Sequence, residues 1–352
     1  MRFPKFSGEW EICKVSELLD FYSTNSLSWE QLEYGEKAMM NLHYGLIHVG
    51  LPTMVDLRRD KLPNVKEGNM PKNFELCKEG DVAFADASED TNEVAKVIEL
   101  FNLDNKDIVC GLHTIHGRDN KNKTIVGFKG YAFSSSAFHN QIRRIAQGTK
   151  IYSISTKNFS ECYVGIPSKA EQTKIATLLR LIDERIATQN KIIEKLQSLI
   201  KGLNDNIHKG IKGETVCFSD LGEAYSGLSG KGGDDFGYGE PFITYMNVYQ
   251  NTYISEKDYE LVQIAPNEKQ NSVQYGDALF TLSSETPEEV GIGAVYLGNT
   301  QKLYLNSFCF GIHFYDERVL PQYLAHFISS SSFRRAIYPL AQGSTRFNLQ
   351  KK

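Results

Sequence analysis

The residue types that most often carry catalysis or bind metals are present in this chain, but their spacing fits neither use. Two histidines, His113 and His116, fall on opposite alternations of a strand-like stretch or in a turn, so neither is expected to bind a metal. The cysteines are scattered without a C-x-x-C pair: Cys13, Cys77, Cys110, Cys162, Cys217 and Cys309. This spacing predicts free thiols in a reducing compartment, and we therefore expect a cytoplasmic protein.

Catalytic motifs of the common enzyme classes are missing from the sequence. The one phosphate-loop lookalike, Gly230-Lys231, is followed by Gly232 where Ser or Thr is required. Neither the G-x-S-x-G of hydrolases nor the H-E-x-x-H of zinc proteases occurs. The Asn-Pro-Pro-aromatic motif of amino-methyltransferases and the Glu-x-Lys pattern of metal-dependent nucleases are absent as well. We therefore expect a non-catalytic chain that binds no metal and no cofactor.

Basic residues gather in short clusters that could bind phosphate groups. Arg and Lys contact phosphate oxygens and guanine edges in proteins that read nucleic-acid sequence. Because the net charge is −4, nucleic acid would have to bind a local patch. The candidate DNA-binding residues are Arg58, Arg59, Arg118, Lys121, Lys123, Arg143, Arg144, Lys150, Lys231, Arg334, Arg335 and Arg346, and Lys351-Lys352 is a further basic pair. For each of them the alternative is a solvated surface held in salt bridges.

The chain contains an internal repeat. Residues 133–149 align without gaps on residues 328–344, an offset of 195 residues, and both segments run through Ser-Ser-Ser to Ala-Gln-Gly. Upstream, Glu79-Gly-Asp81 matches Tyr275-Gly-Asp277 at nearly the same offset. A period of this length indicates a duplicated domain rather than a solenoid. The basic residues do not match between the copies. This is expected if the two copies recognise different nucleic-acid sequences, and also if the basic residues form unrelated structural ion pairs.

Each copy is predicted to be a mixed α/β domain, which gives the chain an α+β fold class. The length of 352 residues suits two domains, each large enough to bury its own core. Short apolar strands are expected to follow the two Gly-Asp turns. Helices are predicted over residues 131–146 and 321–341, each ended by the glycine of its Gln-Gly pair as a C-cap.

A long helix is predicted between the copies, over residues 171–208. This stretch has no proline, and its apolar residues alternate steps of four and three, the period of a coiled coil. The positions of this seam are Ile182, Ile186, Gln189, Ile193, Leu196, Ile200, Leu203 and Ile207. A helix of that length would extend about 55 Å. The apolar seam should be covered by a partner, and Gln189 either fixes its register or is simply exposed.

This arrangement resembles the specificity subunit of type I restriction-modification systems. The segment Ile166-Pro-Ser, followed by Glu171-Gln172, Ile175-Ala176, Leu179, Asp183 and Ile186, is similar to the central conserved region of that family. The Ala-Gln-Gly ends and the Gly-Asp turns are similar to its target-recognition domains. The resemblance covers essentially the whole chain and implies target-recognition domains over residues 1–165 and 211–352, separated by a conserved helix over residues 166–210.

The resemblance also implies a function and partners. Each domain would read half of a bipartite double-stranded DNA site, while the helix would set the spacing and dock methyltransferase subunits. A restriction and translocase subunit would join that assembly. S-adenosylmethionine, ATP and Mg would be bound by those partner subunits.

One feature departs from the family pattern. The family carries a second conserved helix after the second recognition domain, and the sequence ends before that position. We therefore expect a second copy or another helix to complete the coiled coil. The alternative function is a truncated interaction module that competes for methyltransferase subunits without reading DNA.

Overall fold

The computed structural model describes residues 3–35 and 39–349, and the chain divides into two compact units. Unit 1 is Met1–Gln189 and unit 2 is Asn190–Lys352. The basic pair Lys351-Lys352 lies outside the described residues. Among the helices that are described, none is both long enough and apolar enough to cross a membrane.

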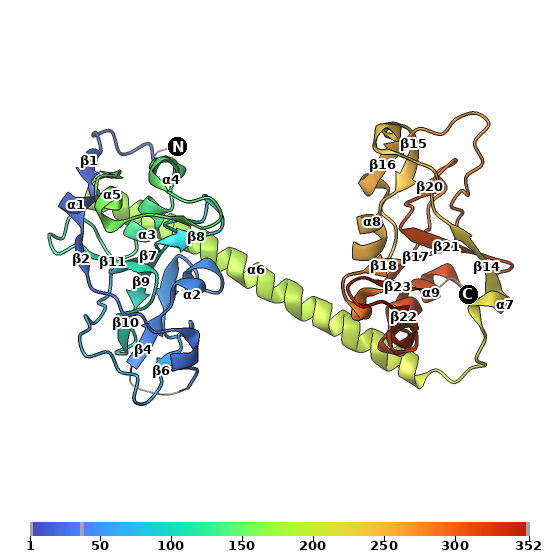
Figure 1. The fold of residues 1–352 in the computed structure, drawn as a ribbon, viewed down its shortest axis with the longest axis horizontal. Coiled ribbons are helices and arrows are strands. Elements are labelled where there is room, and N and C mark those ends of the chain that lie inside the picture. The colour runs from blue at the N-terminus through green and yellow to red at the C-terminus, as the bar shows by residue number, and fades with distance from the viewer. Residues whose placement is uncertain (1–2, 36–38, 350–352) are drawn as a thin grey trace. The chain divides into compact units, whose positions relative to one another are not determined.

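Unit 1 is built on a five-stranded sheet of order β2-β11-β7-β9-β5, accompanied by a four-stranded sheet of order β10-β4-β6-β3 (Figure 1). Two further strand pairs, β1-β13 and β12-β8, complete its sheets. Its strands are β1 Glu11–Lys14, β2 Asp20–Tyr22, β3 Leu32–Glu33, β4 Met39–Leu42, β5 Met54–Asp56, β6 Asn64–Val65, β7 Val82–Ala85, β8 Ala87–Ser88, β9 Val97–Asn102, β10 Asp107–Cys110, β11 Thr114–Arg118, β12 Tyr152–Ser153 and β13 Tyr163–Ile166. Its short helices are α1 Val15–Leu18, η1 Trp29–Gln31, α2 Tyr44–His48, α3 Lys129–Phe133, α4 Ser136–Ile145 and α5 Thr156–Ser160.

Unit 2 has a four-stranded sheet of order β14-β21-β17-β19 and two three-stranded sheets, β16-β15-β20 and β18-β23-β22. Its strands are β14 Gly222–Ser226, β15 Phe236–Ile243, β16 Tyr259–Val262, β17 Ala278–Thr281, β18 Ser283–Ser284, β19 Gly293–Val295, β20 Tyr304–Leu305, β21 Cys309–Phe314, β22 Ala341–Gln342 and β23 Phe347–Leu349. Its helices are α7 Phe218–Leu221, η2 Gly233–Asp235, α8 Tyr245–Gln250, η3 Glu256–Asp258, η4 Pro287–Glu289, α9 Pro321–Ile328, α10 Ser331–Ile337 and η5 Tyr338–Leu340.

The same antiparallel sheet recurs in both units, which confirms the predicted pair of similar mixed α/β domains. The order β2-β11-β7-β9 in unit 1 is repeated as β14-β21-β17-β19 in unit 2. Registers agree as well, because Val82 pairs with Gly117 in one sheet and Ala278 with Ile312 in the other. Each central strand directly follows its Gly-Asp turn, as the sequence predicts.

Aromatic rings fill the core beside each of these sheets. In unit 1 the buried rings of Phe84, Phe133 and Phe138 pack edge to face around the central strand β7. Phe280 and Phe333 stack in unit 2, where Phe280 lies on β17. Burial of such rings stabilises each unit by roughly 1.5–3 kcal/mol a side chain, so each unit holds its own core.

The two helices predicted over residues 131–146 and 321–341 are each broken in two. The second helix of each pair begins after a serine N-cap. Ser135 accepts a hydrogen bond from the backbone N–H of Phe138 at the start of α4, and Ser330 accepts one from that of Phe333 at the start of α10. A serine N-cap starts a new helix because its hydroxyl satisfies an amide that the helix leaves free. The predicted glycine C-caps are wrong: α4 ends at Ile145 and α10 at Ile337, before Gln-Gly is reached.

The long helix α6 is continuous from Lys169 to Gly210, which confirms the predicted rod (Figure 1). At its start Ser168 caps the helix and accepts from the N–H of Glu171. The boundary between the two units falls inside this helix, after Gln189. The domain limits at residues 165 and 210 stay predictions.

Candidate nucleic-acid interface

A tight hairpin follows the second helix of each pair, and glycine determines its shape. Gly148 has φ +145° and Gly343 φ +149°, in the region that favours glycine. A β-carbon on either residue would lie about 2 Å from a carbonyl oxygen, 1.9 Å from that of Ile151 or 2.0 Å from that of Arg346. The repeated Gln-Gly therefore builds a hairpin, over residues 147–153 in unit 1 and 342–348 in unit 2.

Both hairpins carry an exposed cation at the tip, Lys150 in unit 1 and Arg346 in unit 2. The Arg346 guanidinium lies 5.8 Å from the ring centroid of the exposed Phe308, within range of a cation–π contact. In the strand register, His113 occupies in unit 1 the place of Phe308. A cation beside an exposed ring offers both charge and a stacking face to a nucleic acid.

Two of the predicted arginines tie their helix to a loop of their own unit. The Arg334 guanidinium donates to the carbonyl oxygens of Glu288, Val290 and Gly291 at 2.6–2.7 Å. Burial lowers the pKa of Arg334. Arg143 donates to the side chain of Asn92 at 2.9 Å, in the equivalent loop of unit 1. These two side chains therefore do the same structural work from non-equivalent helix positions.

Four of the exposed predicted cations form no ion pair, and no hydrogen bond outside their own helix, with any described residue: Arg144, Lys150, Arg335 and Arg346. Arg335 donates only to Ser331 of its own helix. Because these groups stay hydrated and unpaired, they are the cations best able to bind a phosphate or a base edge.

The adjacent pair Arg58 and Arg59 lines a separate hollow of about 590 Å³ together with Lys61, Lys106 and Tyr34. The Arg58 Nε donates to Asp56 at 2.9 Å, and this contact lowers the pKa of the Asp56 carboxyl. Arg59 lies 3.9 Å from Glu184. Both guanidinium groups stay about half exposed and so could still bind an anion.

Arg118 and Lys231 are used inside the protein, contrary to their prediction as surface contacts. Arg118 is buried, donates to both oxygens of Asp81 at 2.8–2.9 Å and contacts Glu75 at 2.7 Å. Lys231 forms a 2.6 Å ion pair that holds the pKa of the Glu268 carboxyl at about 2. Arg118 cannot turn outward without removing its charge from the buried Asp81 carboxylate, and the Lys231 side chain is itself only 8% exposed.

Lys121 and Lys123 hold the loop before α3 against the first elements of unit 1. The ammonium of Lys121 donates to the carbonyl of Glu17 at 2.8 Å. That of Lys123 pairs with Glu11 at 2.6 Å, which raises the pKa of the lysine. We therefore expect these two lysines to contribute little to a DNA interface.

The first turn of α6 is fixed to unit 1 by two buried polar side chains. The Gln172 amide accepts from the N–H of Ile125 at 2.9 Å and donates to the carbonyl oxygens of Lys123 and Pro167. Glu171 is buried and accepts from the Trp10 indole at 3.3 Å. These contacts explain why a Ser-x-x-Glu-Gln sequence begins the helix.

The last turns of α6 are held by unit 2. Asn204 donates to the carbonyl of His326 at 2.8 Å, and Asp205 accepts from the N–H of Ser331 at 2.7 Å. Hydrogen bonds from Ser331 lower the pKa of the Asp205 carboxyl. The His208 ring lies against Tyr323 and Phe327.

The predicted seam of α6 is exposed. Its apolar members are between 45 and 62% exposed, although such side chains normally lie inside. They are Ile182, Ile186, Ile193, Leu196, Ile200, Leu203 and Ile207, and Gln189 is exposed among them. Ile192 and Leu199 widen the stripe to about three positions a heptad. A stripe of that width and exposure is typical of a helix that packs against other helices.

The fold brings together three residues of types that bind metals, although their spacing in the sequence does not predict such a cluster. Cys77, Cys110 and His116 are buried, with ligand atoms within 4.8 Å of one another and the two sulfurs 3.6 Å apart. His116 also contacts Asp81 through Nε2 at 2.7 Å. A structural zinc site needs four ligands, and this cluster offers three. Val273 and Leu305 stand in unit 2 where the two cysteines stand, so we assign the thiols to the core.

Comparisons with known proteins agree with this architecture. Residues 60–198 match the family model described as the type I restriction modification DNA specificity domain. The type I restriction enzyme EcoKI specificity subunit of Escherichia coli (strain K12) is 26% identical over 238 residues, which are 60% of this chain and 49% of that protein. The chain thus spans about half the length of this curated relative.

Solved structures share the fold at low sequence identity. The type I restriction-modification S subunit from M. genitalium superimposes with a TM-score of 0.51 and 13% identity, over 97% of this chain and 85% of that chain. A chain from a structural study of complex assembly and conformational transition of the type I R-M system gives a TM-score of 0.52 and 13% identity, over 94% and 85%.

Proposed function

The chain belongs to the type I restriction-modification specificity family through its residues 60–198, and we propose from this premise that it recognises a bipartite sequence in double-stranded DNA. Each unit reads one half of the site. The observation that carries the proposal is the repeat itself: one fold occurs twice, and each copy presents a glycine-defined hairpin with an exposed cation at its tip.

The subunit is proposed to be non-catalytic and to act within a larger complex. Its long helix separates the two recognition units and docks methyltransferase subunits, and a restriction and translocase subunit joins the assembly. The partners bind S-adenosylmethionine, ATP and Mg. The exposed apolar stripe of α6 supports this role, because burying the exposed half of about seven such side chains against a partner would contribute roughly 5–10 kcal/mol.

Reconstitution with a methyltransferase subunit tests the proposal. We expect weak DNA binding by the chain alone, because its net charge is −4, and much tighter binding by the complex. Mapping of methylated sites should then return one bipartite sequence. Methylation without sequence preference in the reconstituted complex would refute DNA reading by this chain.

Variants of the free cations sharpen that test. Arg144→Ala with Lys150→Ala should alter only one half of the mapped site, and Arg335→Ala with Arg346→Ala only the other. A base-reading arginine should cost about 1–3 kcal/mol at one position, whereas a phosphate contact should weaken all sequences and reduce the salt dependence. Lys72→Ala and Lys269→Ala, exposed cations away from the hairpins, are the matched controls.

A second candidate function rests on the two arginines whose side chains hydrogen-bond to a loop of their own unit. Arg143 and Arg334 bond inside their own units, as expected if the basic clusters are structural and the chain is an interaction module. Such a module would compete for methyltransferase subunits through α6. It predicts that the chain inhibits methylation by a related complete system, and that the hairpin variants do not change this inhibition.

The seam itself needs a partner under either function, and we expect a second copy or another helix to supply it. Light scattering after size exclusion should show self-association or a stoichiometric complex with a methyltransferase subunit. Ile193→Glu with Ile200→Glu should abolish that association while leaving the helical content unchanged. A stable monomer that binds no partner helix would count against pairing in trans.

A further inference from the structure

The hairpins of residues 147–153 and 342–348 hold one residue in the same backbone setting in both units. A β-carbon on Gly148 would lie 1.9 Å from the carbonyl oxygen and 2.8 Å from the carbonyl carbon of Ile151. On Gly343 it would lie 2.0 and 2.8 Å from the same two atoms of Arg346. Each carbonyl therefore lies directly against a glycine that has no side chain to displace it. We call residues 151 and 346 the shared position.

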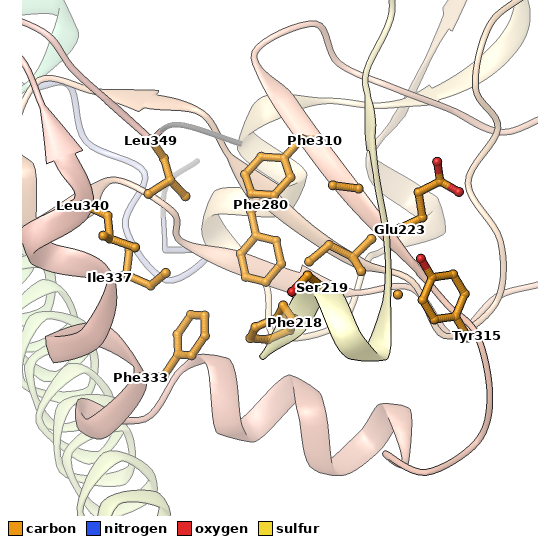
Figure 2. Close-up of a pocket in the computed structure, with 13 residues that line it drawn as sticks. Phe218, Ser219, Glu223, Phe280, Phe310, Tyr315, Phe333, Ile337, Leu340 and Leu349 are labelled. Atoms are coloured by element: carbon orange, nitrogen blue, oxygen red, sulfur yellow. The ribbon is translucent and has the colours of Figure 1, made fainter. Parts of the chain in front are cut away.

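The strand that leaves each hairpin is anchored in the same way. The N–H of Ile154 donates to the carbonyl of Asp86 at 2.9 Å, and that of Leu349 donates to the carbonyl of Leu282 at 2.8 Å. Ile154 and Leu349 are themselves buried. Figure 2 shows Leu340 and Leu349, which lie on either side of the hairpin of unit 2, among the apolar side chains around a cavity of about 490 Å³. The shared position precedes each anchor by three residues, so it occupies an equivalent place on each unit.

The ring beside the shared position is equivalent in the two units, whereas the side chain at that position differs. His113 in unit 1 and Phe308 in unit 2 occupy the same place in the strand register. Ile151 is 62% exposed. Arg346 is exposed too, and its guanidinium lies beside the ring of Phe308. One backbone frame thus presents an apolar group in unit 1 and a cation in unit 2.

The surroundings of Ile151 are unsuited to a phosphate group. Ile151 lines a hollow of about 650 Å³ together with His113 and the carboxylates of Glu89 and Glu93. Lys96, the lysine of this lining, is paired with Glu93 at 2.8 Å. Carboxylates repel a phosphate, and an isoleucine has no group that binds one. A nucleic acid that contacts the shared position of unit 1 therefore does so through a base edge.

Given the proposed reading of DNA by both units, on which this step rests, we infer that the shared position reads one base pair in each half of the site. Ile151 contacts the methyl group of a thymine, because apolar side chains recognise that methyl in the major groove. Arg346 donates to O6 and N7 of a guanine in the other half, which a guanidinium matches with two hydrogen bonds. Because the two backbones agree, the position that faces a base edge in unit 1 faces one in unit 2 as well.

Mapping of methylated sites with the reconstituted complex tests this assignment. Ile151→Ala should remove the preference for one A·T pair in one half of the site. Arg346→Ala should lower the preference for one G·C pair in the other half by about tenfold or more. Ile12→Ala and Arg318→Ala, at exposed residues of the same types outside the hairpins, should leave the site unchanged. Both shared-position side chains are exposed, so circular dichroism of the variants should match that of the parent.

Failure of this assignment and failure of the proposed function give different results. A parent complex without any sequence preference refutes DNA reading by this chain. A parent complex with a bipartite site that Ile151→Ala and Arg346→Ala leave unchanged overturns the shared position alone. A change at a base pair of the other kind also overturns it, and each variant decides the assignment for its own unit.

Base analogues test each contact with the unmodified chain in the complex. Uracil in place of the assigned thymine removes only the methyl group and should raise the Kd about three- to fivefold for the parent, but not for Ile151→Ala. In the other half, 7-deazaguanine removes only the N7 acceptor and should raise the Kd on the order of tenfold for the parent, but not for Arg346→Ala. Fluorescence anisotropy with a labelled duplex measures both. Equal losses in parent and variant would mean that the side chain does not read that atom.

Arg346→Lys separates base reading from phosphate contact. Lysine keeps the charge but lacks the planar fork that matches O6 and N7 together. The preference for guanine should therefore fall several-fold, while the salt dependence of binding stays that of the parent. An unchanged preference in Arg346→Lys, with equal weakening of all sequences in Arg346→Ala, would assign Arg346 to a phosphate and overturn the inference for unit 2.

Discussion

The two units share one sheet but treat the same buried aspartate differently. Asp81 and Asp277 follow equivalent turns, and each accepts from two side chains of its sheet. In unit 1 these are Arg118 and His116. In unit 2 they are His313 and the hydroxyl of Tyr225. The position of the buried carboxylate is thus the same in both units, whereas the side chains that donate hydrogen bonds to it differ between them.

The electrostatic consequence is opposite in the two units. Burial works to raise the pKa of the Asp81 carboxyl, but the hydrogen bonds from His116 and Arg118 hold it below its ordinary value. Burial also raises the pKa of Asp277, and there its partners do not overcome the effect. A full guanidinium charge stabilises a buried carboxylate, whereas a histidine and a phenol do so less.

A second interior difference involves an ion pair in unit 1 and two aliphatic residues in unit 2. Glu99 and Lys129 are buried 3.1 Å apart, and the carboxylate also accepts from two backbone N–H groups. Val295 and Leu324 occupy the corresponding positions in the core of unit 2. Similar folds thus tolerate either solution, as expected where desolvation offsets the attraction of a buried pair.

Removing the partners of the two aspartates should give the largest contrast. Arg118→Leu leaves Asp81 buried without its guanidinium and should destabilise unit 1 by about 3–5 kcal/mol. His313→Leu should cost unit 2 only about 1 kcal/mol, because the pKa of Asp277 is already raised. Both tryptophans, Trp10 and Trp29, lie in unit 1, so their fluorescence during urea unfolding reports on that unit alone.

Unfolding of unit 2 can be followed by alkylation of Cys309, which is buried there. The control for each variant is the unit that it does not touch. Equal losses of stability in the two units would mean that Arg118 and His313 stabilise their aspartates equally, and would contradict the proposed difference between Asp81 and Asp277.

The ion pair should behave as a coupled unit. Lys129→Leu alone leaves Glu99 unpaired and should cost about 3 kcal/mol of unfolding free energy. Adding Glu99→Val, so that unit 1 carries the residues of unit 2, should recover part of that loss. A double-mutant cycle measured by tryptophan fluorescence should give a coupling of about 1–3 kcal/mol. Strict additivity of the two single changes would contradict a direct interaction.

The tied arginines should affect stability more than their free neighbours do. Arg334→Ala leaves three carbonyl oxygens without their donor and should cost unit 2 about 1.5–3 kcal/mol. Arg143→Ala, which removes exposed contacts to Asn92 and Asn140, should cost unit 1 about 1 kcal/mol or less. The adjacent controls, Arg335→Ala and Arg144→Ala, should each stay within about 0.5 kcal/mol of the parent. Urea titrations with the two reporters measure all four.

Acidification should give the smallest effect and should separate the units by sign. The depressed pKa of Asp81 adds stability that is present above its ordinary value of 3.8 and is lost as the pH falls through the folded pKa below it. The raised pKa of Asp277 means that unit 2 gains stability as the pH falls from neutral towards 3.8. Unfolding midpoints at a series of pH values check this, with Asp81→Asn and Asp277→Asn as controls whose trends should disappear.

The sequence predicts the features that depend on local pattern or on repetition. The rod from Lys169 to Gly210 follows from unbroken helical periodicity, and the shared sheet follows from the repeated turns before Val82 and Ala278. The helix breaks at Ser135 and Ser330 could also have been predicted, because serine is a strong N-cap residue. We predicted one helix through each of them since the apolar spacing continues across the break.

Pairings between distant residues could not be predicted in the same way. Arg118 reaches Asp81 across neighbouring strands, and Lys231 reaches Glu268 from a glycine-rich loop. These long-range contacts determine which arginines hydrogen-bond to another element and which do not. The charge pattern of the sequence does not distinguish the two kinds of arginine. The assignment of individual DNA contacts therefore stays a prediction. Its best candidates are the exposed cations that form no ion pair, and no hydrogen bond outside their own helix, with a described residue.

The hairpins at Gly148 and Gly343 have a consequence for how such a protein diversifies. Because the missing β-carbon determines the loop shape, the frame is independent of the residues at the tip. Lys150 and Arg346 already differ in chemistry and are one position apart in the repeat register. Point mutations at these tips can therefore change the chemistry of the loop while the domain beneath stays intact, and each copy can acquire new preferences independently of the other.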